Sequence, residues 1–264
     1  MKPASDGAPR AADCDEERLA VLTGKVPGEI RRRRLYGRLP SNPRCVLCYA
    51  PFGRPGAVLM RSLGRGQFAK NPRFCERCFK ASVSHHGGCE LEIVALFVDV
   101  RGSTSLAERI GPAAYARVLD RYYGVALDEM VAHQAFIEIT GDEVYGFYLP
   151  AFTPGNPARI AIETAVRILR GVVDLELGAG VHAGTAWVGS VGDPTRLSDF
   201  RSIGDTVNVG ARLVAQAGAG ECLISETAFR QAELRPELHK ARELKLAGKS
   251  GIVAARVLSI KEGT

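Results

Sequence analysis

The chain from about residue 91 onward alternates between short apolar runs and stretches with helical spacing. The unbroken apolar run 93–98 predicts a buried strand, and two runs flanking Gly141-Asp142 predict a hairpin. The strands expected are 93–98, 135–139, 144–149, 175–191 and 221–225, with a last hairpin in 242–257 across Gly248. The helices expected are 112–133, 157–170 and 205–216. This order predicts an α+β domain with a mixed or antiparallel sheet and flanking helices.

The first 90 residues have a different composition. Residues 1–15 are small and polar, which predicts a disordered lead, and 16–39 predict a basic helix broken near Pro27-Gly28. Residues 40–90 are rich in Pro, Gly, Arg and Cys and poor in β-branched residues, so something other than hydrophobic burial is expected to stabilise them. We therefore divide the chain into a lead with a basic helix (1–39), a Cys-rich module (40–90) and an α+β domain (91–264).

Composition narrows the class of protein. Of the 264 residues, 46% are hydrophobic and 24% charged, as in ordinary globular proteins. There is no apolar run of about 18 residues and no charged segment followed by an apolar stretch, so we expect neither a membrane span nor a secretion signal, and a cytoplasmic protein.

The net charge of +6 comes from the front of the chain, where residues 1–90 hold 17 Lys and Arg against 8 Asp and Glu. The run Arg31 to Arg34 could bind nucleic acid, acidic lipid or an acidic partner. A solvated helix face is the more frequent explanation of such a run, and the segment lacks the aromatic or recognition-helix pattern of nucleic-acid readers, so we do not expect nucleic acid as a partner.

Two CxxC pairs stand out among the seven cysteines. Four thiolates at this spacing can surround a tetrahedral zinc ion, so a structural zinc site is predicted in a zinc-ribbon-like module. An iron–sulfur cluster or a redox-active dithiol are the alternatives, and His85, His86 or Cys89 could replace one ligand. Cys14 and Cys222 are expected to be free thiols, because a disulfide framework does not fit a reducing compartment. The expected ligands are Cys45, Cys48, Cys75 and Cys78.

The buried strand 93–98 ends in a carboxylate, Asp99, and continues into a turn that opens a helix. The turn residues Gly102, Ser103 and Thr104 offer main-chain N–H groups and a helix dipole to phosphate oxygens, while Asp99 can hold Mg²⁺ against them. These residues by themselves indicate only a phosphate site.

A second carboxylate, Asp142, lies in the expected hairpin turn. Two carboxylates on neighbouring strands can bind two divalent ions, although Gly-Asp is also an ordinary turn dipeptide. In the helix 205–216, Asn208 and Arg212 are four residues apart and share a face, so an amide and a guanidinium project towards one place.

Taken in order, these three segments make residues from about 91 to 257 resemble the class III adenylate and guanylate cyclase catalytic domain of bacterial type. The resemblance implies a ferredoxin-like fold that works as a head-to-tail homodimer. It implies that Asp99, Val100 and Asp142 bind two Mg²⁺ or Mn²⁺ ions in one subunit. Asn208 would orient the ribose and Arg212 would stabilise charge on the α-phosphate, both from the other subunit. His182, in a glycine-containing strand, is expected to be structural.

The base-reading positions depart from the adenylate cyclase pattern. The resemblance places Glu138 and Arg201 there, where adenylate cyclases carry a Lys and an Asp or Thr. A carboxylate accepts from guanine N1–H and its amino group, and Arg201 could donate to guanine O6, so hydrogen-bond logic favours GTP. The two could instead pair with one another, or be an exposed strand residue and a surface loop cation, so ATP or GTP remains open.

The sequence therefore predicts a lyase of cyclic-nucleotide signalling, which converts a purine nucleoside triphosphate to its 3′,5′-cyclic monophosphate and pyrophosphate. Physically, the two ions would activate the ribose 3′-hydroxyl and brace the phosphates. A non-enzymatic nucleotide-binding module of the same fold is the alternative. The zinc module, directly before the strand that carries Asp99, is expected to be regulatory.

Overall fold

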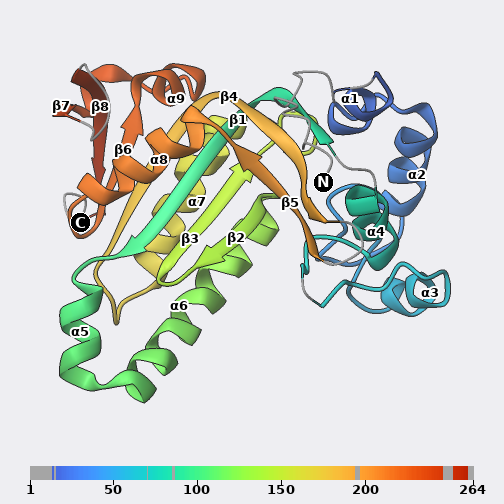
Figure 1. The fold of residues 1–264 in the computed structure, drawn as a ribbon, viewed down its shortest axis with the longest axis horizontal. Coiled ribbons are helices and arrows are strands. Elements are labelled where there is room, and N and C mark those ends of the chain that lie inside the picture. The colour runs from blue at the N-terminus through green and yellow to red at the C-terminus, as the bar shows by residue number, and fades with distance from the viewer. Residues whose placement is uncertain are drawn as a thin grey trace, which may run out of the picture.

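The computed structural model describes residues 14, 16–69, 71–84, 87–193, 197–245 and 252–260. Within these residues, eight strands form one sheet in the order β2-β3-β1-β4-β6-β8-β7, with β5 paired to the far end of β4 (Figure 1). All neighbouring pairs are antiparallel except β4 and β6, which are parallel. The strands are β1 (Gly87–Val100), β2 (Phe136–Thr140), β3 (Glu143–Tyr148), β4 (Leu177–Asp193), β5 (Leu197–Ile203), β6 (Glu221–Ser225), β7 (Lys240–Lys245) and β8 (Ile252–Ser259).

Helices cover both faces of this sheet. One face packs against α6, α7 and α9, and the opposite face carries α8 and, beside it, the N-terminal part of the chain (Figure 1). The helices are α1 (Glu16–Leu22), α2 (Pro27–Gly37), α3 (Gly56–Ser62), α4 (Glu76–Ser84), α5 (Ser103–Ile110), α6 (Pro112–Ala132), α7 (Pro157–Gly171), α8 (Asp205–Gln216) and α9 (Glu226–Gln231), with a short 3₁₀ turn at Pro236–Leu238. The α+β class and the mixed sheet predicted from the sequence are confirmed.

Strand β1 lies at the centre, and its apolar run explains why. Six consecutive residues of β1, 93–98, are buried. Alternate side chains point to opposite faces of a strand, so Leu96 and Val98 pack under α6 and α7, while Ala95 and Phe97 face the other layer. A strand covered on both faces needs this unbroken apolar sequence.

Helix α8 approaches the sheet unusually closely, and two glycines permit it. A Cβ on Gly180 would lie 2.5 Å from the main-chain nitrogen of Val214, and one on Gly210 would lie 2.7 Å from the ring of Phe97. Larger side chains would therefore push α8 away from β4 and β1. The helix that carries Asn208 and Arg212 is fixed in position by this contact.

The Cys-rich segment shares a hydrophobic core with the sheet. The ring of Phe74 lies 5.7 Å from that of Phe136 in β2 and 5.9 Å from that of Phe200 in β5. Fully buried Arg73 donates to the carbonyls of Val131, in the last turn of α6, and Ala135, directly before β2. Residues 45–78 therefore pack directly onto strands β2 and β5.

Most of the expected elements are confirmed, and β5 is the strand that the sequence did not predict. The basic segment 16–39 forms two helices, α1 and α2, separated where Pro27 was expected to break it. The final hairpin is present, whereas its Gly248 lies outside the described residues. Among the described helices, none is long and apolar enough to cross a bilayer.

Candidate functional site

Carboxylates gather where β1 ends and the β2–β3 hairpin turns. Asp99 in β1 lies directly opposite Glu143 in β3 in the antiparallel ladder, and Asp142 immediately precedes Glu143. The charge of Asp142 acts on both Asp99 and Glu143. The fold therefore brings together the two aspartates that the sequence singled out, and adds Glu143 as a third carboxylate that sequence reasoning missed.

These carboxylates lie in an environment that disfavours so much negative charge. Burial raises the pKa of Asp99, and the charge of Asp142 raises it further, whereas the ion pair with Arg101 lowers it. Burial raises the pKa of Glu143 to about 7, with the charges of Asp99 and Asp142 adding to the effect. Such a cluster favours a bound cation, because a cation would relieve the mutual repulsion.

The two turns beside the carboxylates require their glycines. Gly102 has φ 64° and precedes α5, whose first residues are Ser103 and Thr104. Gly141 has φ 61° and precedes Asp142, and the hydroxyl of Tyr123 donates to its carbonyl. Side chains are disfavoured at such φ values, so glycine fixes the geometry of both turns.

Val100 occupies the position between Asp99 and the first turn. Its side chain is buried at 3% exposure, and its main-chain N–H donates to Asp99 Oδ1 at 2.9 Å. Only its main chain can take part in polar contacts there.

A groove of about 610 Å³ opens next to the carboxylates, between β2, β3, β5 and α8. The rings of Phe97 and Tyr145 stack with centroids 4.3 Å apart within its lining. The hydroxyl of Tyr145 is hydrogen-bonded to that of Ser202 in β5. This volume lies in the range of small-molecule sites, and an aromatic wall suits a flat ring.

Glu138 and Arg201 both line this groove and pair with one another. Arg201 Nη1 lies 3.5 Å from Glu138 Oε2, and Arg201 Nε donates to Asp199 Oδ2 at 3.3 Å. Burial raises the pKa of Glu138 to about 7, against the lowering effect of Arg201. The sequence left open that Glu138 is an exposed strand residue and Arg201 a surface loop cation. The Glu138 side chain is only 17% exposed, and Arg201 lies in strand β5 rather than in a loop. The mutual pairing left open by the sequence is present.

Asn208 and Arg212 lie on α8 but do not line the same groove. The α8 residues that face it are Val207 and Ala211. Asn208 directly follows Val207, and Arg212 directly follows Ala211. Successive side chains of an α-helix point about 100° apart, so Asn208 and Arg212 point away from the groove. Asn208 is exposed and Arg212 half-buried, and they share a face as expected. The single chain therefore does not bring them together with Glu138.

The four cysteines of the CxxC pairs form a compact buried cluster. Their sulfur atoms all lie within 4.8 Å of one another, and Cys48 Sγ is 3.8 Å from Cys75 Sγ. Sulfur atoms that share a tetrahedral zinc at ~2.3 Å lie about 3.8 Å apart. The N–H of Cys75 donates to Cys45 Sγ, and Arg65 lies 3.8 Å from Cys78 Sγ. The donor set and spacing fit a tetrahedral metal site.

The comparisons with known proteins address the domain that contains these groups. No family model matches the chain. An uncharacterised protein of Mycobacterium tuberculosis is 30% identical over 171 residues, which are 61% of this chain and 31% of that protein. Adenylate cyclase 1 of Rhizobium meliloti is 29% identical over 145 residues, which are 49% of this chain and 22% of that protein. The chain thus spans less than a third of the length of these curated relatives.

The solved structures decide the fold. The guanylyl cyclase Cya2 superposes with a TM-score of 0.60 at 26% identity, covering 67% of this chain and 96% of that one. The adenylyl cyclase CyaB of P. aeruginosa superposes with a TM-score of 0.59 at 24% identity, covering 66% of this chain and 97% of that one. This chain contains a domain with the fold of class III nucleotide cyclases, hereafter the cyclase domain. The cyclase domain takes up about two thirds of the chain, and the predicted resemblance is confirmed.

One expectation about the cysteines outside the cluster was wrong. Cys14 is bonded to Cys89, at the start of β1 in the cyclase domain, with a Cα–Cα distance of 4.8 Å. The two are 75 positions apart, so only the tertiary fold places them together. The expectation of free thiols rested on a reducing compartment, which says nothing about this contact. Cys89 is thereby removed from the candidate metal ligands, while Cys222 is free and buried, as expected. His85 and His86 lie outside the described residues.

His182 of the cyclase domain lies in β4, opposite Ala95 and not opposite Asp99 in the pairing of β4 with β1. Its Nδ1 is 3.5 Å from the hydroxyl of Thr227, which donates to the carbonyl of Ala183. It does not line the groove beside Glu138. These contacts suit the structural role expected for it.

Proposed function

We propose that the cyclase domain converts a purine nucleoside triphosphate to its 3′,5′-cyclic monophosphate and pyrophosphate, as a homodimer, for cyclic-nucleotide signalling. The observation that carries the proposal is the cluster of Asp99, Asp142 and Glu143, of which Glu143 lines the groove, within a domain of cyclase fold. The family supports cyclase chemistry, and the site has the charge that this chemistry requires.

The residues at the end of β1 fit two divalent ions. Oxygen atoms of Asp99 and Asp142, with the main-chain carbonyl of Val100, are the hard ligands that Mg²⁺ and Mn²⁺ prefer. Burial, together with the neighbouring carboxylates, raises the pKa values of Asp99 and Glu143, and bound cations would stabilise their ionised forms. Bound there, the ions would supply Lewis acidity to the ribose 3′-hydroxyl and the phosphates.

The remaining groups would bind and orient the substrate. Gly102, Ser103 and Thr104 would donate main-chain and hydroxyl hydrogen bonds to the phosphate oxygens. Asn208 would orient the ribose, and the guanidinium of Arg212 would stabilise charge on the α-phosphate. Because these last two lie outside the groove of their own chain, we assign them to the site of a second copy.

Glu138 and Arg201 would read the base. Both line the groove, and a purine ring can lie against its aromatic wall. An ionised Glu138 accepts hydrogen bonds, which suits guanine, whereas a protonated Glu138 can donate to adenine N1. With its pKa raised to about 7, Glu138 populates both states near neutrality. We therefore propose either ATP or GTP as the substrate.

A second candidate, a cyclase-like module that binds nucleotide without turnover, is favoured by two ion pairs. Arg101 holds Asp99, and Arg201 holds Glu138, so groups needed for metal and base are already engaged. A protein that cannot release them would bind nucleotide poorly and would not cyclise it.

The division at about residue 90 and the four-cysteine zinc site complete the proposal. Cys45, Cys48, Cys75 and Cys78 would hold a structural zinc, and residues 40–90 would form the module that stabilises or regulates the cyclase domain.

A direct assay separates the two candidate functions. Purified protein is incubated with ATP or GTP and with Mn²⁺ or Mg²⁺, and cyclic AMP, cyclic GMP and pyrophosphate are quantified. We expect equimolar cyclic nucleotide and pyrophosphate from the wild type and none from Asp99→Ala. Nucleotide binding without product under every combination would identify the binding module instead.

A further inference from the structure

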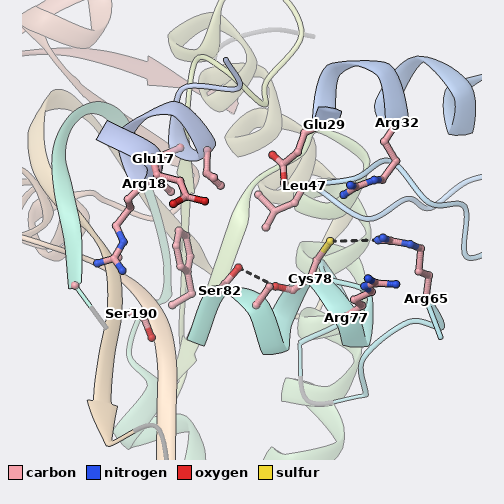
Figure 2. A pocket seen from close by; sticks show the side chains of 16 residues that line it. Glu17, Arg18, Glu29, Arg32, Leu47, Arg65, Arg77, Cys78, Ser82 and Ser190 are labelled. Atoms are coloured by element: carbon pink, nitrogen blue, oxygen red, sulfur yellow. Dashed lines mark hydrogen bonds between the residues drawn. The ribbon is translucent and has the colours of Figure 1, made fainter. Parts of the chain in front are cut away.

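A second cavity, of about 330 Å³, has none of the three carboxylates, Asp99, Asp142 and Glu143, in its lining. Figure 2 shows the side chains around it. Helices α1, α2 and α4, the loop after α3, and strands β4 and β5 all contribute to its walls. It therefore lies between the N-terminal third of the chain and the cyclase domain. Nothing in the proposed cyclase reaction uses it.

One end of this cavity is cationic. Arg32 of α2, Arg65 after α3 and Arg77 of α4 lie on the same side in Figure 2. Arg65 is directed at the sulfur atoms of Cys78 and Cys75, at 3.8 and 4.0 Å. Arg77 is exposed. Among the residues that the structure describes, neither Arg77 nor Arg32 has a hydrogen bond or ion pair, although the charge of Arg32 acts on nearby Glu29.

The charges at this end do not cancel. With the proposed divalent zinc, the four thiolates would carry a net charge of about −2, and Arg65 and Arg33 both act on these sulfurs. Glu29 of α2 lines the cavity beside Arg32, and its negative charge balances one of the two remaining positive charges, those of Arg32 and Arg77. Of Arg32 and Arg77, one positive charge is left without a counterpart.

The middle and the far end have a different character. Leu22, Leu47 and Phe200 are buried and form an apolar wall. Glu17 and Arg18 of α1 bring one charge of each sign to the side away from the three arginines, so they leave the net charge of the cavity unchanged (Figure 2). At the opposite side of the cavity from the three arginines lies Ser190 of β4, 4% exposed (Figure 2). Its hydroxyl is buried and has no hydrogen-bond partner among the residues that the structure describes. Buried hydroxyls in native proteins are nearly always hydrogen-bonded, so this one indicates a missing acceptor or donor.

We propose that this cavity binds a small organic acid, with its single oxyanion on Arg32 and Arg77, an apolar body along Leu22, Leu47 and Phe200, and a polar tip on Ser190. Guanidinium groups from two helices are suited to a carboxylate, and the enclosed volume limits the body to a compact ring or short chain. The amount of unbalanced charge selects a monoanion over a dianion.

The site is placed to act on the nucleotide groove as an effector site. Phe200 precedes Arg201 in β5, so a ligand that contacts the Phe200 ring lies one residue from the cation that pairs with Glu138. Alternate residues of a strand face opposite sides, so the two cavities share β5 as a common wall. Binding itself does not depend on the proposed cyclase activity.

Calorimetric titration of the full zinc-loaded chain tests the proposal. The probes are 3-phenylpropionate, its 4-hydroxyphenyl analogue, phenyl phosphate, and the neutral 3-phenylpropan-1-ol. We expect both carboxylates to bind more tightly than the alcohol by about tenfold, the loss of one charge-assisted contact, and more tightly than phenyl phosphate. No binding at millimolar concentration, equal binding of the alcohol, or a preference for phenyl phosphate would overturn the assignment.

Variants locate the ligand. Arg77→Ala is expected to weaken 3-phenylpropionate by about tenfold, whereas Arg54→Ala, an exposed arginine outside the cavity, leaves its affinity unchanged. Ser190→Ala is expected to remove the advantage of the 4-hydroxyl group without changing the affinity for the plain ring. Equal effects of the two arginine variants would place the ligand elsewhere on the surface. Circular dichroism of each variant confirms folding.

Discussion

The guanidinium of Arg73 donates from Nε to the main-chain carbonyl of Ala135 at 2.6 Å and from Nη1 to that of Val131 at 2.9 Å. Arg73 lies two residues before Cys75, and Ala135 directly precedes β2. Val131 lies in the last turn of α6 and Ala135 in the link between α6 and β2, so a cation from the Cys-rich module holds this junction through two main-chain carbonyls. The strand that leads to Asp142 therefore begins at a point fixed by the module.

We expect Arg73→Ala to lower the free energy of unfolding by about 2–4 kcal/mol, because it removes two charge-assisted hydrogen bonds and a fully buried side chain. Burial already lowers the pKa of Arg73 to about 10, and a lysine there would lose its charge more readily and reach fewer carbonyls. Urea denaturation measures the change. Arg54→Ala, which removes an exposed arginine of the same module, should differ from the wild type by no more than about 0.5 kcal/mol. Equal stability of the two variants would show that the contact contributes nothing.

The cysteine cluster should bind one zinc ion per chain. Elemental analysis of purified protein is expected to give equimolar zinc and no iron, and Cys45→Ser should lose the metal because a hydroxyl is a poor zinc ligand. Cys222→Ala, which removes a free cysteine outside the cluster, should retain it. Absorption in the visible range together with bound iron would instead indicate an iron–sulfur cluster.

A mixture of two inactive variants should recover activity if the site is shared between two chains. Asp99→Ala and Arg212→Ala are each expected to be inactive alone. After subunit exchange, half of the dimers are mixed and each mixed dimer has one intact site, so activity should return to about a quarter of the wild type. Asp99→Ala mixed with Asp142→Ala is the control, because both changes then fall in the same half-site and no intact site forms. No recovery in the first mixture would mean that Arg212 acts in its own chain.

Glu138 should make stability depend on pH. Its pKa is raised from 4.5 to about 7, so the folded protein binds the proton more tightly than the unfolded chain. The folded state then binds more protons between these values, and stability falls as pH rises through the window. Glu138→Gln should remove this loss and be more stable than the wild type above neutral pH by about 1–3 kcal/mol.

Thermal unfolding of wild type and Glu138→Gln at several pH values measures this difference. Glu243→Gln, an exposed carboxyl of β7, is the matched control and should follow the wild type. If the stability of wild type and of Glu138→Gln depended on pH in the same way, burial of the Glu138 carboxylate would not be the cause of the pH dependence.

Elements whose sequence pattern agrees with their tertiary environment were predictable. Strand β6 and helix α8 have the bounds expected from the sequence. Strand β5 was missed because its apolar residues, Leu197, Phe200 and Ile203, recur every third position, which is not strand periodicity. It is a strand because β4 continues far enough to pair with it.

The candidate site was predictable only where its residues carry a family pattern. Asp99 and Asp142 were found by motif, whereas Glu143 joins them through the register of β1 and β3. The Arg73 contact spans 62 positions, and the Cys14–Cys89 bond spans 75. Local spacing does not reveal such contacts, because they depend on how whole elements pack.

The aromatic contact between Phe74 and its neighbours Phe136 and Phe200 has a practical meaning for dissecting the protein. A fragment that begins at β1 lacks Phe74 and would expose the rings of Phe136 and Phe200 to water as a hydrophobic patch. We expect such a fragment to aggregate. Failure of such a fragment to cyclise nucleotide would therefore say little about regulation. Melting of the front third and melting of the sheet are expected to be one cooperative event, so loss of the metal proposed for the cysteine cluster is expected to lower the solubility of the whole chain.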